Sequence, residues 1–245
     1  MAGAGPVQVR LDQVRKGYGR GEGRVLALDG VSLTFAAGTF TALMGPSGSG
    51  KSTLLHCAAG LDKPDEGRIH LGDTELTRLG ESKLLDVRRQ RIGVVFQSFN
   101  LVASLTAAEN VALPARLAGQ KVRREAVHEL LARVGLADRA RHLPSSLSGG
   151  QQQRVAIARA LFTGPDVVFA DEPTGALDTR AGADVLGLLR ETVDTWGQTV
   201  VMVTHDPRAA SMADRVVFFA DGKVAGELTS PSAERIGSWL AELGA

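Results

Sequence analysis

A glycine-rich segment carries the pattern most directly tied to chemistry. Residues 45–52 read Gly-Pro-Ser-Gly-Ser-Gly-Lys-Ser, the spacing G-x-x-x-x-G-K followed by Ser or Thr. Without Cβ atoms the glycines let the backbone curl around an anion, and a following helix would direct its amides and positive dipole end at it. The Lys51 ammonium can reach the β- and γ-phosphates of a nucleoside triphosphate, and the Ser52 hydroxyl can ligate Mg²⁺. We therefore predict a site for ATP and Mg²⁺ formed by Gly45, Pro46, Ser47, Gly48, Ser49, Gly50, Lys51, Ser52 and Thr53.

The local setting of this segment supports that interpretation. Residues 39–44 (Thr-Phe-Thr-Ala-Leu-Met) are typical of a short buried strand, and residues 52–59 of a helix closed by Gly60. The alternative is a glycine-rich turn that binds nothing. A strand–loop–helix arrangement favours the phosphate loop over that alternative.

Two adjacent carboxylates follow an apolar run further along the chain. Residues 167–170 (Val-Val-Phe-Ala) predict a buried strand, so Asp171 and Glu172 emerge at its carboxyl end, where ligands bind in open α/β sheets. Asp171 is suited to orient Mg²⁺ through its water shell, and Glu172 to take a proton from an attacking water, which is worth about 10²–10⁴ in rate. Alone, such a pair is more often a pair of loop acids. Downstream of a phosphate loop, the catalytic role is favoured, with Lys51 stabilising charge on the transferring phosphoryl group.

A second glycine-rich segment precedes a helix predicted over residues 152–161. In Leu147-Ser148-Gly149-Gly150-Gln151, Ser148 suits a helix N-cap and the glycines expose backbone amides, which predicts another anion site. A plain helix cap explains Ser148 but not a second anion site. A chain with one phosphate loop has no evident use for that site within itself. We therefore predict head-to-tail pairing of two copies, each ATP lying between one copy's Lys51 and the other's Ser148.

Composition limits the classes of protein to consider. The 245 residues are 44% hydrophobic and 22% charged, as in ordinary globular proteins, and a net charge of +1 gives no reason to expect nucleic acid as a partner. The one cysteine, Cys57, excludes an internal disulfide and suits packing. No apolar run reaches the length of a membrane span. We expect a soluble, cytosolic protein that works at a membrane only through another chain.

The order of predicted elements indicates the fold class. A strand over 7–14 and a strand pair over 25–35 predict a small antiparallel sheet ahead of the phosphate loop, with a glycine-rich turn at 17–23, and residues 68–71 are strand-like. Strands alternating with helices after residue 164 predict an α/β fold whose mostly parallel sheet is covered on both faces. Between the strand at 92–96 and that region lies a helical insertion. The remaining predicted helices and strands cover 107–117, 122–134, 152–161, 181–196, 199–203, 215–219, a short strand after 222, and 233–243.

Taken together, the three motifs resemble the ATP-binding subunit of an ABC transporter over essentially the whole chain. Residues 45–52 resemble the Walker A motif, 147–151 the family signature, and 167–172 the Walker B motif with its catalytic glutamate. The resemblance implies one domain, 1–245, with a P-loop NTPase (RecA-like) core at about 1–97 and 160–245. It also implies an N-terminal antiparallel β subdomain and an inserted α-helical subdomain at about 98–159.

The same resemblance assigns residues that have no specific signal by themselves. Gln97 resembles the glutamine that touches Mg²⁺ and the attacking water, and His205 the histidine that contacts the γ-phosphate. Asp178 resembles the acid of the D-loop at the dimer interface, although Gly175 stands where Ser is usual. Tyr18 resembles the aromatic that stacks on adenine, the alternative being a surface residue.

Three segments narrow the resemblance further: 96–101, 105–111 and 147–161 look like the branch that holds macrolide-exporter, lipoprotein-release, antimicrobial-peptide-resistance and cell-division ATPases. This implies ATP hydrolysis that drives a separate integral membrane permease at the inner face of the plasma membrane, in export or extraction. Mechanical signalling through a permease-like partner remains an alternative. A soluble ABC ATPase acting on ribosomes or DNA is less favoured, because such chains usually carry two cassettes or an inserted coiled coil. Intact Lys51, Asp171, Glu172 and His205 argue against a non-catalytic regulator.

Overall fold

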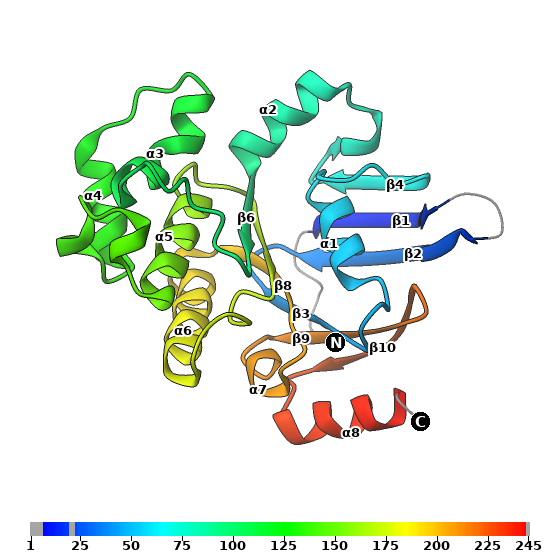
Figure 1. Cartoon of the computed structure of the whole chain (residues 1–245). Helices are drawn as coiled ribbons and strands as arrows, with labels where there is room; N and C mark the ends of the chain where they lie inside the picture. The colour runs from blue at the N-terminus through cyan, green and yellow to red at the C-terminus, as the bar shows by residue number, and fades with distance from the viewer. Residues whose placement is uncertain (1–6, 20–22, 244–245) are drawn as a thin grey trace.

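The computed structural model describes residues 7–19 and 23–243, and its strands form two sheets (Figure 1). The first is antiparallel with strand order β2-β1-β4-β5. Its strands are β1 (Val7–Tyr18), β2 (Val25–Ala36), β4 (Glu66–Leu71) and β5 (Thr74–Glu75). The predicted small antiparallel sheet is therefore confirmed, and residues 20–22 of the predicted turn lie outside the described residues.

One detail of that sheet prediction was wrong. Residues 25–35 form the single strand β2, not a strand pair, because β1 pairs with it from Val7↔Ala36 to Tyr18↔Val25. Gly30 has a φ of 69° where the register shifts, so the glycine accommodates a bulge and does not end the strand. Because of this pairing, β1 extends past its predicted end at residue 14, and Tyr18 is its last paired residue.

The second sheet has the order β10-β9-β3-β8-β7-β6 and is parallel except for β10 (Lys223–Thr229). Its parallel strands are β3 (Phe40–Met44), β6 (Ile92–Phe96), β7 (Val167–Asp171), β8 (Thr199–Val203) and β9 (Arg215–Ala220). Every residue of β3 and β8 is buried, as expected of strands covered on both faces. Parallel strands end at one edge, so residues 45, 97, 172 and 204 leave the sheet on the same side.

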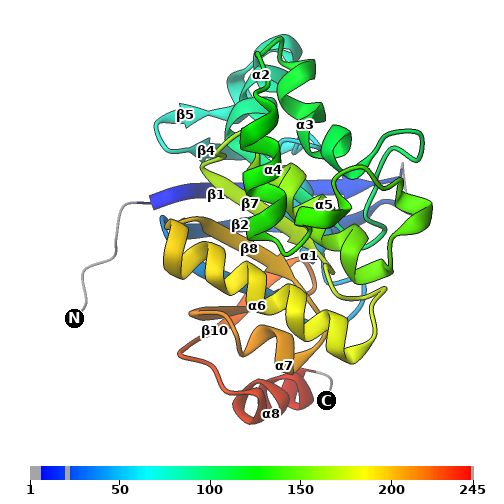
Figure 2. The same ribbon diagram turned by 90° about the vertical axis from the view of Figure 1, so that its left-hand side faces the viewer.

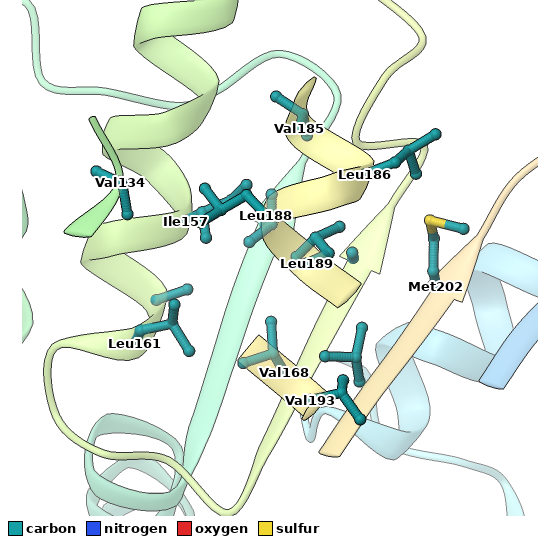
Figure 3. Close-up of a cluster of buried hydrophobic side chains, with 14 of the residues drawn as sticks. Val134, Ile157, Leu161, Val168, Val185, Leu186, Leu188, Leu189, Val193 and Met202 are labelled. Carbon is teal, nitrogen blue, oxygen red and sulfur yellow. The ribbon is translucent and has the colours of Figure 1, made fainter. Parts of the chain in front are cut away.

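Alternate residues of this sheet belong to two separate cores. In β8, Val201 and Val203 pack with the antiparallel sheet and with α1 (Lys51–Ala58), which lies between the two sheets (Figure 1). Val200 and Met202 pack on the opposite face with α5 (Gly149–Leu161) and α6 (Thr179–Trp196). Figure 3 shows the second core, in which side chains from α5, α6 and the sheet interlock. The prediction of a sheet covered on both faces is confirmed.

The helical part of the chain lies on one side of the six-stranded sheet, and α6 runs along that face (Figure 2). It contains α3 (Ala107–Leu117), α4 (Arg124–Arg133) and short turns at Ala137–Arg139 and Pro144–Ser146. The predicted helix at 152–161 begins at Gly149 instead, because Ser148 and Gln151 form a capping box that starts the helix before its apolar stripe. Gly149, Gly150 and Gln151 are therefore the first turn of α5, not a loop before it.

Two helices were not predicted from the sequence. α2 (Glu81–Arg91) has no buried residue, so it lacks the apolar period by which helices are found in a sequence. α7 (Pro207–Ala210) is a single turn, whereas α8 (Ala233–Leu243) has the predicted bounds. Among the described residues, no helix is long and apolar enough to cross a membrane.

Candidate nucleotide site

The glycine-rich loop after β3 has the geometry of an anion-binding turn. Gly45, Gly48 and Gly50 have φ values of 144°, 79° and 100°. A Cβ on Gly45 would lie 2.0 Å from the Phe219 carbonyl oxygen, and one on Gly50 would lie 2.1 Å from that of Ala27. Both positions therefore require glycine. The loop leads directly into α1, whose N-cap is Gly50, so no cap side chain covers the amides of the first turn.

Lys51 is held inside this loop. Its ammonium donates to the carbonyls of Gly45 at 2.9 Å and Pro46 at 2.7 Å, and to Ser49 Oγ at 3.2 Å. Burial lowers the pKa of Lys51, and the negative charges of Glu172 and Asp171 oppose that shift. A cation with few water contacts beside two carboxylates is suited to bind a phosphate group.

The Ser52 hydroxyl and Asp171 meet at the end of β7. Ser52 Oγ donates to Asp171 Oδ1 at 3.0 Å, and His56 Nε2 lies 3.5 Å from Asp171 Oδ2. Hydrogen bonding to Asp171 raises the pKa of His56, and burial opposes that effect. Hydroxyl and carboxylate oxygens are the hard ligands that Mg²⁺ prefers, so these two of the three predicted metal-binding side chains form a suitable pair. His56 was not predicted, because only the fold brings this helix residue to the end of β7.

Glu172 and His205 come from neighbouring strand ends and contact each other. His205 Nδ1 lies 3.0 Å from both carboxylate oxygens of Glu172. Glu172 has a φ of 47°, and its amide donates to the Val203 carbonyl at 3.0 Å. A glutamate in the left-handed region is strained, and the hydrogen bond from its amide to β8 helps to hold it there. The prediction that these two residues share a site agrees with this geometry.

One cavity of about 410 Å³ joins these groups. It is lined by loop residues between Gly45 and Thr53, by Glu172 and His205, and by Tyr18. The Tyr18 hydroxyl donates to Asp62 Oδ2 at 2.7 Å, and the Lys16 ammonium lies 5.2 Å from the centre of its ring. The cavity thus combines an aromatic ring suited to a nucleotide base, a loop suited to its phosphates, and a carboxylate beside the loop.

The other predicted residues lie outside this cavity. Among the described residues, the cavity lining does not include Gln97, Ser148 or Asp178. It does not include Asp171 either, although Asp171 accepts a hydrogen bond from Ser52, which does line the cavity. The Ser148 Oγ accepts a hydrogen bond from the backbone amide of Gln151, and the Gln151 side-chain oxygen accepts one from the backbone amide of Ser148. The Asp178 Oδ1 accepts a hydrogen bond from the backbone amide of Ala181. Ser148 and Asp178 are thus satisfied as N-caps of α5 and α6. Gln97 packs against the backbone of Gly175, where a Cβ would lie 2.8 Å from its Nε2.

Comparison with known proteins identifies the family of this chain. A family model described as "ABC transporter" matches residues 28–175. The dimeric post-hydrolysis structure of the ATP-binding cassette MJ0796 bound to ADP and Pi is 42% identical, with a TM-score of 0.83 over 91% of this chain and 99% of that one. The chain belongs to the ABC transporter family. Its α/β P-loop NTPase fold follows from the same match.

Sequence relatives place this cassette near macrolide exporters. It is 47% identical over 232 residues to the "Macrolide export ATP-binding/permease protein MacB" of Burkholderia pseudomallei (strain 1710b), covering 94% of this chain and 35% of that protein. It is 48% identical over 230 residues to the protein of the same name from Rhodopseudomonas palustris (strain HaA2), covering 93% and 35%. The chain therefore spans about a third of the length of these relatives. The predicted family and branch are confirmed.

Proposed function

We propose that this ABC cassette hydrolyses ATP to ADP and phosphate, with the catalytic base, the lysine and Ser52 lining one cavity and Asp171 hydrogen-bonded to Ser52. The observation that carries the proposal is the position of Glu172, which faces the cavity lined by the Lys51 loop and contacts His205 at 3.0 Å. In this proposal Tyr18 stacks on the adenine, and residues 45–53 bind the phosphates.

The chemistry follows from charge and proton transfer. The Glu172 carboxylate takes a proton from the attacking water, and His205 orients that carboxylate and contacts the γ-phosphate. Lys51 leaves its loop carbonyls for phosphate oxygens and stabilises their charge. Ser52 and Asp171 would hold Mg²⁺, with Gln97 completing its contacts; the bound metal neutralises charge on the phosphates.

We further propose that two copies pair head to tail around two ATP molecules. Ser148, Gly149, Gly150 and Gln151 of one copy would contact the ATP bound by the other copy, and Asp178 would lie at the interface. Two observations support this: these residues lie outside the cavity of their own chain, and a relative at 42% identity is dimeric. In this proposal the core (about 1–97 and 160–245) and the helical subdomain (about 98–159) move relative to each other as the dimer closes.

The partner proposed for this dimer is an integral membrane permease on a separate chain, with few spans and a large extracytoplasmic domain. The cassette would lie in the cytoplasm, bound through that permease to the inner face of the plasma membrane, and power export or extraction. The names of the MacB relatives, which join an ATP-binding part to a permease, support this. Nucleic acid is not an expected partner.

ATP turnover and dimerisation in the purified chain test the enzymatic part. We expect Glu172→Gln to lower turnover by about 10²–10⁴ and to accumulate as an ATP-bound dimer, measured by light scattering after size-exclusion chromatography. Asp221→Asn, at a surface turn outside the cavity lining, is the matched control and should behave as wild type. Unchanged turnover in Glu172→Gln would remove Glu172 as the base. A protein that stays monomeric at saturating ATP would contradict the paired site.

The partner is tested by affinity capture of the chain from its native membranes followed by mass spectrometry. Recovery of a permease with few spans and a large external domain would support the proposed assembly. Recovery with ribosomes or DNA and without a membrane protein would contradict it, while leaving the ATPase chemistry intact.

A further inference from the structure

Gln153, on the second turn of α5, is a fully buried polar side chain that the proposed reaction does not use. Its relative exposure is 0%. Its Nε2 donates to the Pro173 carbonyl at 2.7 Å and to the Phe96 carbonyl at 3.3 Å. Both partners are carbonyls, so the nitrogen must face them. Its Oε1 is buried without a hydrogen-bond partner among the described residues.

The two carbonyls belong to the two loops that carry site residues. Phe96 ends β6 and directly precedes Gln97, whereas Pro173 directly follows Glu172. The β6–β7 ladder ends at the pair Phe96↔Asp171, so no ladder hydrogen bond joins the two loops to each other beyond that point. One carboxamide therefore joins the loops where the sheet stops joining them.

Neighbouring contacts extend the same connection. Arg159, also on α5, donates to the carbonyls of Phe99 and Asn100, which have φ values of 59° and 50°. The first residues of the loop after β6 are thus held by α5, at Phe96 and again at Phe99 and Asn100, and the latter two have a conformation that non-glycine residues rarely adopt. Gly175 leaves the space in which the Gln97 side chain lies against the loop after β7.

Packing alone does not account for glutamine at this position. A buried acceptor without a partner destabilises a fold, and Leu or Met would fill a similar volume without one. The two donated hydrogen bonds are what glutamine adds. Ser148 caps the same helix five residues earlier, a distance of about 7.5 Å along a helix axis.

We infer that Gln153 is a positioning residue that sets Gln97 relative to Glu172 and makes both loops follow the helix that begins at Ser148. The inference rests on the proposed ATPase function for its catalytic consequence. A contact made at Ser148 can then change the positions of Gln97 and Glu172, because α5 and the Gln153 carboxamide connect them.

The test compares Gln153→Leu and Gln153→Met with Gln198→Leu. Gln198 is a matched control, because its Nε2 also donates to a backbone carbonyl, that of Pro165 at 2.8 Å. This contact lies at the amino ends of β7 and β8, away from the site at their carboxyl ends. We expect both Gln153 variants to lower kcat by about 10-fold or more, since small misplacements of reacting groups have large effects. The KM for ATP should stay within about twofold, because the phosphate loop is untouched. Gln198→Leu should leave both constants unchanged.

A second readout does not depend on turnover. In ¹⁵N spectra, the side-chain amide signals of Gln97 should shift in the Gln153 variants and stay in place in Gln198→Leu. In the wild-type protein, the Gln153 side-chain amide protons should exchange slowly with solvent. Unmoved Gln97 signals, rapid exchange at Gln153, or a kcat within about twofold of wild type would overturn the inference. A wild-type chain without ATPase activity would contradict the proposed function instead, and the spectra would still decide the positioning role.

Discussion

The two glycine-rich segments of this cassette begin helices in opposite ways. At α1 the glycines adopt positive φ values, and the glycine N-cap leaves the first amides facing the cavity. At α5 the glycines are part of the helix, and a reciprocal capping box between Ser148 and Gln151 satisfies its first turn. Gly149 lies against Leu177 and Gly150 against Ala181.

The two segments therefore differ in which residues surround them. The first segment is assembled with its lysine, serine and carboxylate partners within one chain. The second is stable by itself and presents Ser148 at an exposed position away from that cavity. In the proposed dimer, the division would link nucleotide binding to association, because each ATP would need one segment from each copy.

Mixing two inactive variants gives the largest effect. Lys51→Ala and Ser148→Arg should each lower turnover by about 10²–10³, as expected when a group that stabilises transition-state charge is lost. If the site is shared, a mixed dimer has both defects in one site and leaves the other intact, so mixing restores part of the activity. ATPase rates across mixing ratios measure this. A mixture as inactive as its components would place both segments in one chain's site.

Substituting the glycines tests whether the two segments differ in backbone strain. Gly45→Ala should destabilise the fold by about 3 kcal/mol or more, because the Cβ would meet a carbonyl oxygen at 2.0 Å and φ is positive. Gly149→Ala should change stability by less than about 1 kcal/mol, since it lies in a helix. Urea unfolding of both variants measures the contrast, and equal losses would contradict it.

Removing the cap of α5 should have a smaller effect. Ser148→Ala loses the acceptor for the Gln151 amide, which costs about 1 kcal/mol at a helix N-cap. Ser148→Asp keeps an acceptor and is the control for stability. Thermal unfolding of the nucleotide-free proteins measures the cap by itself, and an unchanged midpoint in Ser148→Ala would show that the box contributes nothing.

The smallest effect concerns the support beneath Tyr18. Burial would raise the pKa of Asp62, but hydrogen bonds from Lys16 and Tyr18 outweigh it and hold that pKa below 3.8. A lowered pKa adds stability above pH 3.8 that is lost as pH falls through the folded-state value. Asp62→Asn should therefore be less stable by about 0.5–1 kcal/mol at neutral pH, with the difference vanishing in acid. A difference independent of pH in urea titrations would contradict the charge effect.

The sequence by itself determined the local chemistry and most of the elements. The phosphate-loop spacing, the apolar run ending in Asp171-Glu172 and the helix periods at 107–117 and 233–243 are short-range patterns, and each appears in the structure with nearly the predicted bounds. The N-cap prediction at Ser148 is confirmed, but the predicted start of the helix at residue 152 was too late, because it followed the apolar stripe and not the capping box. α2 was missed because none of its residues is fully buried, so it shows no clear apolar period.

Only the tertiary structure decided which residues meet. His56 contacts Asp171, which lies 115 positions away in the sequence. Gln153 contacts Phe96, 57 positions away, and so joins the loops after β6 and β7. Both contacts follow from the order of the strands in the sheet. Periodicity along a chain reports which face of an element is buried, but not which element covers it. The packing of α1 and α5 on opposite faces of one sheet supplies that information, because it brings their side chains to the same edge.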